Sequence, residues 1–348
     1  MKFCVLLLAF AFAACTANTA IPLEYPTPEP PPSATPLPKL ELKRDAELEK
    51  QFAKIAKDAK GKVGVAAVVL ETGEAALLNA DDHYPMQSVY KLPISMAVME
   101  QARLGKLDLD EEIGVTKEDM VRPGQASPLR DKNPNGGEFT IRELIRFALV
   151  ESDGTASDVL MRLAGGPKAV QDYLTQIGIR DMKVVNTEKE FALDWQTQYE
   201  NWTTPIAAVE LIRLVHTGRN ASVNERAPTQ LNGTPSNGRV SARNVNSPSK
   251  IGSDEETDLI VQFMISAVTG PKRLKGLLPS GTRVAHKTGT SGSRAGVTAA
   301  TNDIGIIYLR DGIHLAIAVF VADSPANDKT REAVIARIAK TAWDSWNR

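Results

Sequence analysis

The chain of 348 residues has little cysteine and little histidine, and this scarcity limits its chemistry. Both cysteines, Cys4 and Cys15, lie near the N-terminus, so the part that can fold has neither a disulfide nor a cysteine metal site. The histidines are scattered, with no two at ligand spacing: His83, His216, His286 and His314. We therefore expect no metal centre and no cofactor.

The chain also lacks a charge bias and a long hydrophobic run. Its formal net charge of −1 gives no sign of a surface that binds nucleic acid. The apolar stretch at 5–14, preceded by Lys2, is too short to span a bilayer and is typical of an export signal. Residues 1–14 are therefore predicted to be a signal peptide.

Small residues before Cys15 resemble the cleavage site of a bacterial lipoprotein, in which the cysteine becomes the lipidated first residue. The alternative is ordinary signal cleavage after Ala14 or near Ala20. Residues 15–44 would then form the lipid-anchor cysteine and a linker, because the proline-rich tract at 21–38 cannot pack a core. We expect an exported, periplasmic protein that meets the membrane only through this anchor.

In the rest of the chain, predicted strands lie near both ends and predicted helices lie between them. Strands are expected at 63–70, 75–78, 282–289, 302–309 and 314–322, the last two joined as a hairpin by Asp311-Gly312. Helices are expected at 47–59, 140–150, 155–164, 168–177, 205–217, 258–268 and 328–346. The Asn- and Ser-rich segment at 219–253 shows no periodicity and is predicted to be a long mobile loop. This order predicts an α+β fold, with an antiparallel sheet built from both chain ends and a helical part inserted.

Ser88 and Lys91 stand at the start of a further apolar, helix-like stretch that ends at Gly105. Three residues apart, they would share one face of the helix. A serine hydroxyl needs a neighbouring base to act as a nucleophile, and an amine with a pKa lowered by burial can be that base. S-x-x-K is common, so the pattern gains weight only from two partner motifs, Ser152-Asp153-Gly154 and Lys287-Thr288-Gly289.

These three motifs, in this order, resemble those of the class A serine β-lactamases. Longer stretches agree at 84–93, 127–132, 269–276 and 285–292, and 194–202 resembles the branch with cephalosporinases and extended-spectrum enzymes. The resemblance runs from about residue 40 to the end, except at 219–253. It implies a β-lactamase/transpeptidase-like fold with a five-stranded antiparallel sheet. The domain would be 45–348, with an α/β part at 45–85 and 256–348 and a helical part at 86–255. Penicillin-binding proteins share the motifs.

The resemblance implies hydrolysis of the β-lactam amide of penicillins and cephalosporins through an acyl-enzyme on Ser88. Lys91 would be the base or a proton relay. Ser152 would pass a proton to the departing lactam nitrogen; its alternative role is a helix N-cap. Lys287 would lower the pKa of Ser152 and bind the substrate carboxylate. The expected partner is a β-lactam, and the protein is expected to be a monomer.

The remaining contacts implied by the resemblance lie on the third motif. Thr288 and Thr290 would hydrogen-bond the substrate carboxylate, and Gly289 would let the substrate approach the strand backbone. The backbone N–H groups of Ser88 and Thr290 would form the oxyanion hole. Gly154 would border the substrate, although the family usually has asparagine there, whose amide contacts lysine and substrate.

Deacylation needs a carboxylate to activate water, and the family's glutamate falls on Glu188, with Glu190 as the competitor. Ala192 replaces a residue that usually helps hold this water, and Ala126 stands where the branch often has an aromatic wall. One lost hydrogen bond to a charged partner costs about 1.5–3 kcal/mol, roughly ten- to a hundredfold in rate. Two alternatives therefore stay open: a β-lactam-binding protein with slow deacylation, and a D,D-peptidase of cell-wall peptides.

Overall fold

The structure, a computed structural model, describes residues 41–191, 193–217 and 254–348. The predicted signal peptide, Cys15, the proline-rich tract, Ala192 and the predicted loop at 219–253 lie outside these residues. None of the helices in the described ranges is both long and apolar enough to span a bilayer.

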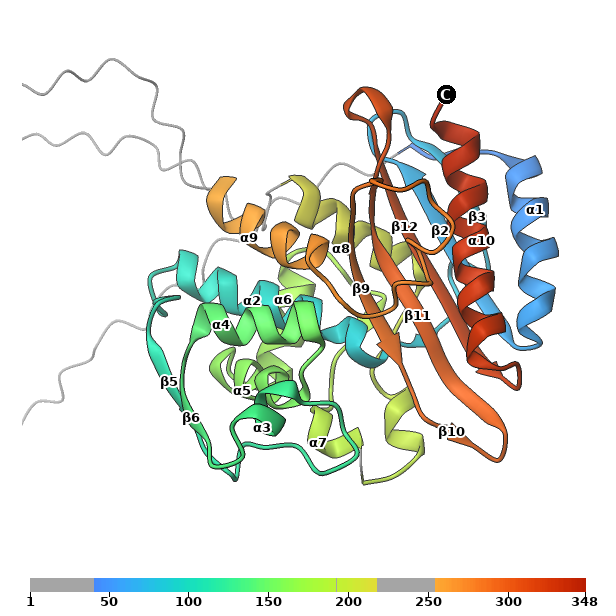
Figure 1. Cartoon of the computed structure of the whole chain (residues 1–348). Coiled ribbons are helices and arrows are strands. Elements are labelled where there is room, and N and C mark those ends of the chain that lie inside the picture. The colour runs from blue at the N-terminus through green and yellow to red at the C-terminus, as the bar shows by residue number, and fades with distance from the viewer. Residues whose placement is uncertain (1–40, 192, 218–253) are drawn as a thin grey trace, which may run out of the picture. The chain divides into compact units, whose positions relative to one another are not determined.

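One mixed sheet is built from both ends of the chain (Figure 1). Its five longer strands are antiparallel in the order β3-β2-β12-β11-β9. They are β2 (Lys62–Val69), β3 (Glu74–Leu78), β9 (Val284–Thr290), β11 (Val297–Tyr308) and β12 (His314–Ser324). The predicted antiparallel sheet from both chain ends is thus confirmed, and β11 and β12 form the expected hairpin.

Two short strands change the predicted count of five. β1 (Lys43–Arg44) pairs parallel with β3, and β10 (Ser293–Arg294) pairs antiparallel with β11. The described part of the sheet therefore has seven strands, and one of its pairs is parallel. The predicted boundary of the linker at residue 44 was also wrong, since Lys43 and Arg44 already belong to the sheet.

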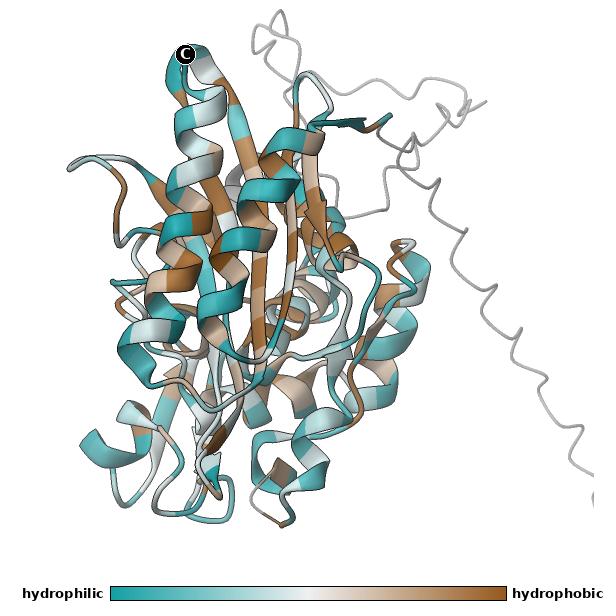
Figure 2. Ribbon diagram, turned by 90° about the vertical axis from the view of Figure 1, so that its right-hand side faces the viewer, coloured by the Kyte–Doolittle hydropathy of each residue, from teal (hydrophilic) through white to brown (hydrophobic). Residues whose placement is uncertain are grey.

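Both faces of the sheet are covered, which explains why β2 and β12 are almost continuously apolar. Val65 and Ala67 pack with α1 (Ala46–Ala56) and α10 (Asp328–Trp346). Ala66 and Val68 face the opposite way, toward the core of the helical part. Figure 2 shows the hydrophobic strands behind two helices whose outer faces are hydrophilic.

The helical part surrounds α2 (Lys91–Arg103), whose residues from Lys91 to Glu100 are all buried. Its longer helices are α5 (Gly154–Leu163), α6 (Pro167–Gln176), α8 (Pro205–Thr217) and α9 (Asp254–Ile265). The shorter ones are α3 (Pro128–Lys132), α4 (Ile141–Arg146) and α7 (Glu188–Phe191). Short strand pairs complete it: β4 (Tyr84–Pro85) and β7 (Met182–Lys183) on β8 (Trp202–Thr203), and β5 (Glu112–Val115) on β6 (Gly137–Thr140).

The helix predicted at 140–150 begins as expected but changes its winding. Thr140 and Glu143 form the predicted capping box. After α4 the chain winds as a π-helical turn, Phe147–Glu151, which ends at Ser152 in the left-handed conformation (φ 60°, ψ 34°). Such turns are frequent at functional sites, and here the turn delivers Ser152 to the cavity described next.

Candidate active site

Ser88 lies in a 3₁₀ turn, Gln87–Tyr90, directly before α2, so the predicted helix is wound more tightly at its start. Side chains three residues apart eclipse one another in this geometry, and Ser88 and Lys91 are therefore aligned. Ser88 opens into a cavity of about 500 Å³. Lys91, the first residue of α2, is only 1% exposed and lies beneath the cavity floor.

The buried Lys91 ammonium has two oxygen partners within the described part of the chain. Its Nζ donates to the backbone carbonyl of Ser152 at 2.7 Å and lies 3.2 Å from Oε2 of Glu188. A buried ammonium needs such partners, because its desolvation is otherwise uncompensated. Lys91 thereby connects Ser152, which is expected to act in acylation, with Glu188, which is expected to act in deacylation.

Besides Lys91, two residues hold Glu188 in place. Asp158 accepts the backbone N–H groups of Glu188 and Lys189 at 2.7 and 3.0 Å. The Tyr90 hydroxyl donates to Oε2 of Glu188 at 2.9 Å, and burial, followed by the nearby Glu188 charge, raises the pKa of Tyr90 well above its usual value. This hydroxyl therefore stays protonated and keeps donating. Burial also raises the pKa of Asp158 to about 6.

Glu190, the competitor of Glu188, has a different task in this structure. Its carboxylate accepts the backbone N–H and the hydroxyl of Thr187 at 2.7 and 2.9 Å. It thus stabilises the start of α7. Glu188 is among the residues that line the cavity, and Glu190 is not.

Ser152 does not cap the helix that follows, so that alternative was wrong. The N-cap of α5 is Asp153, whose carboxylate accepts the backbone N–H of Ala156 at 2.9 Å. The left-handed backbone of Ser152 leaves its side chain on the cavity wall, where Oγ accepts a hydrogen bond from Lys287 Nζ at 2.9 Å.

The opposite wall is the end of β9. Lys287 is fully buried and donates to Ser152 Oγ and, at 3.0 Å, to its neighbour's carbonyl at Thr288. Burial, followed by the charge of Lys91, lowers the pKa of Lys287 well below its usual range. In the part of the chain that the structure describes, Lys287 has no ion pair within 4.0 Å, because its only close acceptors are these neutral oxygens.

Hydroxyl groups on β9 are fixed by residues to which the sequence assigned no role. Thr288 and Thr269 share a hydrogen bond of 2.7 Å between their hydroxyls. Arg273, which is 6% exposed, donates to Thr290 Oγ1 at 2.8 Å and to the carbonyl of Gly289 at 3.1 Å. Thr269 and Arg273 lie in the stretch 269–276 that carried part of the resemblance, but no local pattern pairs them with β9.

The two predicted substrate-contacting glycines do not line the cavity; each instead has a packing reason. A Cβ on Gly289 would lie 2.3 Å from the carbonyl oxygen of Met86, directly before the turn that carries Ser88. A Cβ on Gly154 would lie 2.8 Å from Cγ of Glu188 and 3.2 Å from the carbonyl oxygen of Ala126. Both glycines therefore let neighbouring segments approach.

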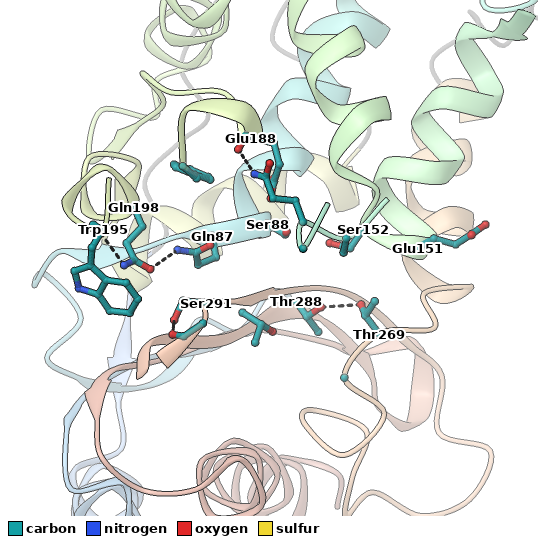
Figure 3. A pocket seen from close by; sticks show the side chains of 17 residues that line it. Gln87, Ser88, Glu151, Ser152, Glu188, Trp195, Gln198, Thr269, Thr288 and Ser291 are labelled. Atoms are coloured by element: carbon teal, nitrogen blue, oxygen red, sulfur yellow. Dashed lines mark hydrogen bonds between the residues drawn. The ribbon is translucent and has the colours of Figure 1, made fainter. Parts of the chain in front are cut away.

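Figure 3 shows how the cavity joins these walls: Ser88, Ser152 and Glu188 lie across from β9, which carries Thr288. At one end, Gln87 donates to Gln198 at 3.1 Å, and Gln198 donates to the carbonyl of Trp195 at 2.7 Å. Gln125 reaches the cavity from another loop and donates to the backbone carbonyl of Glu188. The stretches 84–93 and 194–202 contain Gln87, Trp195 and Gln198, yet nothing local marks them as cavity residues.

Comparison with known proteins agrees with this geometry. The family model of the β-lactamase enzyme family matches residues 47–229 and 247–346. The chain belongs to the class A serine β-lactamases. The β-lactamase is 39% identical to the extended-spectrum β-lactamase PER-1 of Pseudomonas aeruginosa, over 85% of this chain and 86% of PER-1. It is 34% identical to β-lactamase VEB-1 of Pseudomonas aeruginosa, over 83% and 87% of the two chains.

Solved structures give the same answer for the fold. A β-lactamase from Chitinophaga pinensis matches with a TM-score of 0.75 and 38% identity, covering 86% of this chain and 99% of that one. The β-lactamase/transpeptidase-like fold is thereby confirmed. This β-lactamase is a hydrolase of β-lactams that works through a serine acyl-enzyme, as class A enzymes do.

Proposed function

We propose that this β-lactamase acylates Ser88 and removes the acyl group with water activated by Glu188. One observation carries the proposal: Lys91 Nζ lies 3.2 Å from Glu188 and bonds to the carbonyl of Ser152, beneath a cavity lined by Ser88, Ser152 and Glu188. Lys91 thus contacts the carboxylate of Glu188 directly and Ser152 through its backbone carbonyl, and Ser88 stands three residues before it in the same turn.

In the acylation step, Ser88 Oγ attacks the lactam carbonyl carbon. Its proton passes to Lys91 when that residue is a neutral amine, or to Lys91 as the ammonium gives one of its own protons to Glu188. The backbone N–H groups of Ser88 and Thr290 hold the developing oxyanion. As the C–N bond breaks, the Ser152 hydroxyl gives its proton to the lactam nitrogen. The proton taken from Ser88 then returns from Lys91 or Glu188 to Ser152, so that Glu188 is again a carboxylate, and Lys287 keeps its hydrogen bond to Ser152 Oγ and its charge.

The substrate carboxylate is bound at the end of β9. Lys287 provides the charge, and the hydroxyls of Thr288 and Thr290 provide hydrogen bonds. The Arg273 guanidinium, which donates to Thr290 Oγ1, adds a second positive charge behind that hydroxyl. Binding an anion there compensates a buried ammonium whose hydrogen-bond acceptors, in the ranges that the structure covers, are the neutral oxygens of Ser152 and Thr288.

In the deacylation step, Glu188 takes a proton from water, and the oxygen of that water attacks the acyl carbon. The ester bond to Ser88 Oγ then breaks, and the proton held by Glu188 returns to Ser88. Tyr90 and Asp158 orient Glu188 through its carboxylate and its backbone. Glu190 is assigned no catalytic role, because both its hydrogen bonds cap α7.

Time-resolved intact mass spectrometry of the full chain with a penicillin and a cephalosporin tests this mechanism. The wild type should show an adduct that forms and disappears, Glu188→Gln an adduct that accumulates, and Ser88→Ala none. A persistent stoichiometric adduct on the wild type would overturn the proposal in favour of a β-lactam-trapping protein. Release of D-alanine from cell-wall peptides, with little β-lactam turnover, would favour a D,D-peptidase.

We also propose that the chain is exported with residues 1–14 as its signal peptide, is lipidated on Cys15 and acts as a periplasmic monomer. The short apolar stretch before Cys15 and the proline-rich tract after it support this arrangement. The catalytic domain then begins at Lys43, with an α/β part at both ends and the helical part between. Expression in a bacterium should place the wild type in the membrane fraction and Cys15→Ala in the soluble periplasmic fraction. Wild-type protein that is soluble and carries no lipid by mass spectrometry would contradict this.

A further inference from the structure

Two of the scattered histidines meet a glutamate far from the active site. Glu71 lies in the turn after β2, His216 in the last turn of α8, and His314 begins β12. On β11, Tyr308 pairs with His314, whereas Thr301 pairs with the active-site Thr290. Seven residues of strand, at about 3.3 Å each, separate these positions by roughly 23 Å. The cluster is thus at the opposite end of the sheet from the cavity.

Glu71 is already oriented by His314. Its Oε2 accepts the backbone N–H of His314 at 2.8 Å, and its Oε1 lies 2.7 Å from Nδ1 of the same residue. His216 Nε2 is 4.0 Å from this Oε1, and the two imidazole rings lie 4.1 Å apart between centroids. One ligand atom from each of the three residues lies within 4.8 Å of the others.

Hydrogen bonding within the cluster leaves His216 unexplained. Its 4.0 Å distance to Glu71 is too long for a hydrogen bond. A zinc ion with bonds of 2.0–2.1 Å sets tetrahedral ligand atoms about 3.4 Å apart. Side-chain rotations that move these three ligand atoms by about 1 Å would bring them to that spacing.

We propose that Glu71, His216 and His314 bind one divalent ion of the zinc class, with water completing a tetrahedral shell. Two imidazole nitrogens and a carboxylate oxygen form a set that suits zinc and its neighbours among the transition metals. The backbone N–H of His314 holds the carboxylate from its outer side, as groups behind metal ligands commonly do. The sequence could not indicate this site, because its ligands are 145 and 98 residues apart along the chain.

The ion would tie α8 to two strands of the sheet. A ligand that binds only the folded state raises stability by mass action. Because the cluster is remote from Ser88, β-lactam hydrolysis should not depend on the ion. Activity therefore serves as the check that each variant is folded, and metal binding is measured directly.

Isothermal titration of the full chain with ZnCl₂, after treatment with a chelator, tests the site. The wild type and the matched control His83→Gln, which changes an exposed histidine elsewhere, should bind one equivalent of zinc with the same affinity. His216→Gln and His314→Gln should bind it at least tenfold more weakly while keeping wild-type hydrolysis. Zinc should raise the melting temperature of the first two proteins only.

Cobalt(II) absorption separates this site from the two cysteines. Binding by imidazole and carboxylate gives visible d–d bands without the intense near-ultraviolet band of a cobalt–thiolate bond. An intense thiolate band, equal zinc affinity in all four proteins, or no stoichiometric binding by the wild type would each overturn the proposal.

Discussion

Two fully buried lysines contact Ser152, Lys91 at its backbone carbonyl and Lys287 at its hydroxyl, and their positive charges are balanced differently. Lys91, on the helical wall, lies 3.2 Å from the Glu188 carboxylate and bonds to the carbonyl of Ser152. Among the residues that the structure describes, Lys287, on β9, reaches only neutral oxygens within hydrogen-bond distance, and burial lowers its pKa well below the usual range. The charge of Lys91 is therefore balanced by Glu188, whereas the charge of Lys287 can be balanced by the carboxylate of a bound substrate.

The difference assigns the two walls separate tasks. On the helical wall, a paired lysine and glutamate can exchange protons without creating a new charge in the protein interior. On the strand wall, an unpaired cation is costly in the free enzyme and favourable when a carboxylate binds. The substitutions below test this division, beginning with the largest expected effect.

Glu188→Gln should remove the base that the helical wall supplies for deacylation. The amide keeps the shape of the side chain but cannot take a proton from water, so kcat should fall by about 10³-fold while acylation continues. Steady-state kinetics with a chromogenic cephalosporin, read beside the mass of the acyl-enzyme, measures both steps. Glu190→Gln is the matched control; it removes a cap and should change kcat less than about threefold. A larger effect for Glu190→Gln would reverse the assignment.

Replacing each lysine by methionine should change the free energy of unfolding by different amounts on the two walls. Lys91→Met leaves Glu188 partly buried without its cation and should lower the free energy of unfolding by about 3 kcal/mol. Lys287→Met removes a desolvated charge along with its hydrogen bonds, so its net effect should stay within about 1 kcal/mol. Both should lower kcat/KM at least a hundredfold. Urea denaturation compares them, and equal destabilisation would remove the distinction.

The free energy of unfolding of the wild type should vary with pH in a way that depends on Lys287. Because its pKa is lower when folded, the unfolded chain binds more protons between the folded and unfolded values, and this residue's contribution to stability rises with pH there. Lys287→Met should lose that rise.

Elements whose signals are local could be read from the sequence. The closing helix, α10, has the predicted bounds, and the capping box at Thr140 marked the start of α4. Ser88 and Lys91 were aligned by their spacing alone. In contrast, β11 begins at Val297, five residues before the prediction, because its first residues show no apolar alternation and are ordered by pairing with β10 and β12.

Features that depend on contacts between distant segments could not be read. The π-helical turn before Ser152 has no sequence pattern, and the contact of Lys91 with Glu188 spans 97 residues, so only the resemblance indicated it. Gly154 looked like a missing asparagine, whereas the structure places Glu188 and Ala126 against it. The meeting of His216 with His314 likewise required the packing of α8 on β12.

Restoring the family's asparagine should therefore harm this enzyme. In Gly154→Ala or Gly154→Asn the new Cβ would lie 2.8 Å from Cγ of Glu188, so the carboxylate must move away from Lys91. We expect deacylation to slow about tenfold and stability to fall by about 1–3 kcal/mol. Gly114→Ala, where the new methyl would lie 3.3 Å from Oε1 of the exposed Glu138 side chain, is the control and should stay close to the wild type. Faster deacylation in Gly154→Asn would show that the glycine is a defect.

The last effect concerns the pH dependence of stability at Asp158, the carboxylate behind Glu188. Burial raises its pKa to about 6, so between about pH 4 and 6 the folded state binds more protons here than the unfolded chain does. This residue's contribution to stability therefore falls as pH rises through that window, by an amount on the order of 2 kcal/mol. In Asp158→Asn this fall should be absent. The stability of the variant relative to the wild type should therefore increase as the pH rises from 4 to 6.

Urea unfolding at several pH values measures this difference, and Asp110→Asn provides a control of opposite sign. The hydrogen bond from Arg142 lowers the pKa of the exposed Asp110, so its contribution is kept above its unfolded value and lost as the pH falls. If the stabilities of both variants, relative to the wild type, changed with pH in the same direction, Asp158 would be charged over the whole range from pH 4 to 6. The helical wall would then hold two carboxylates for its one lysine, and its contrast with the strand wall would be sharper than a single ion pair makes it.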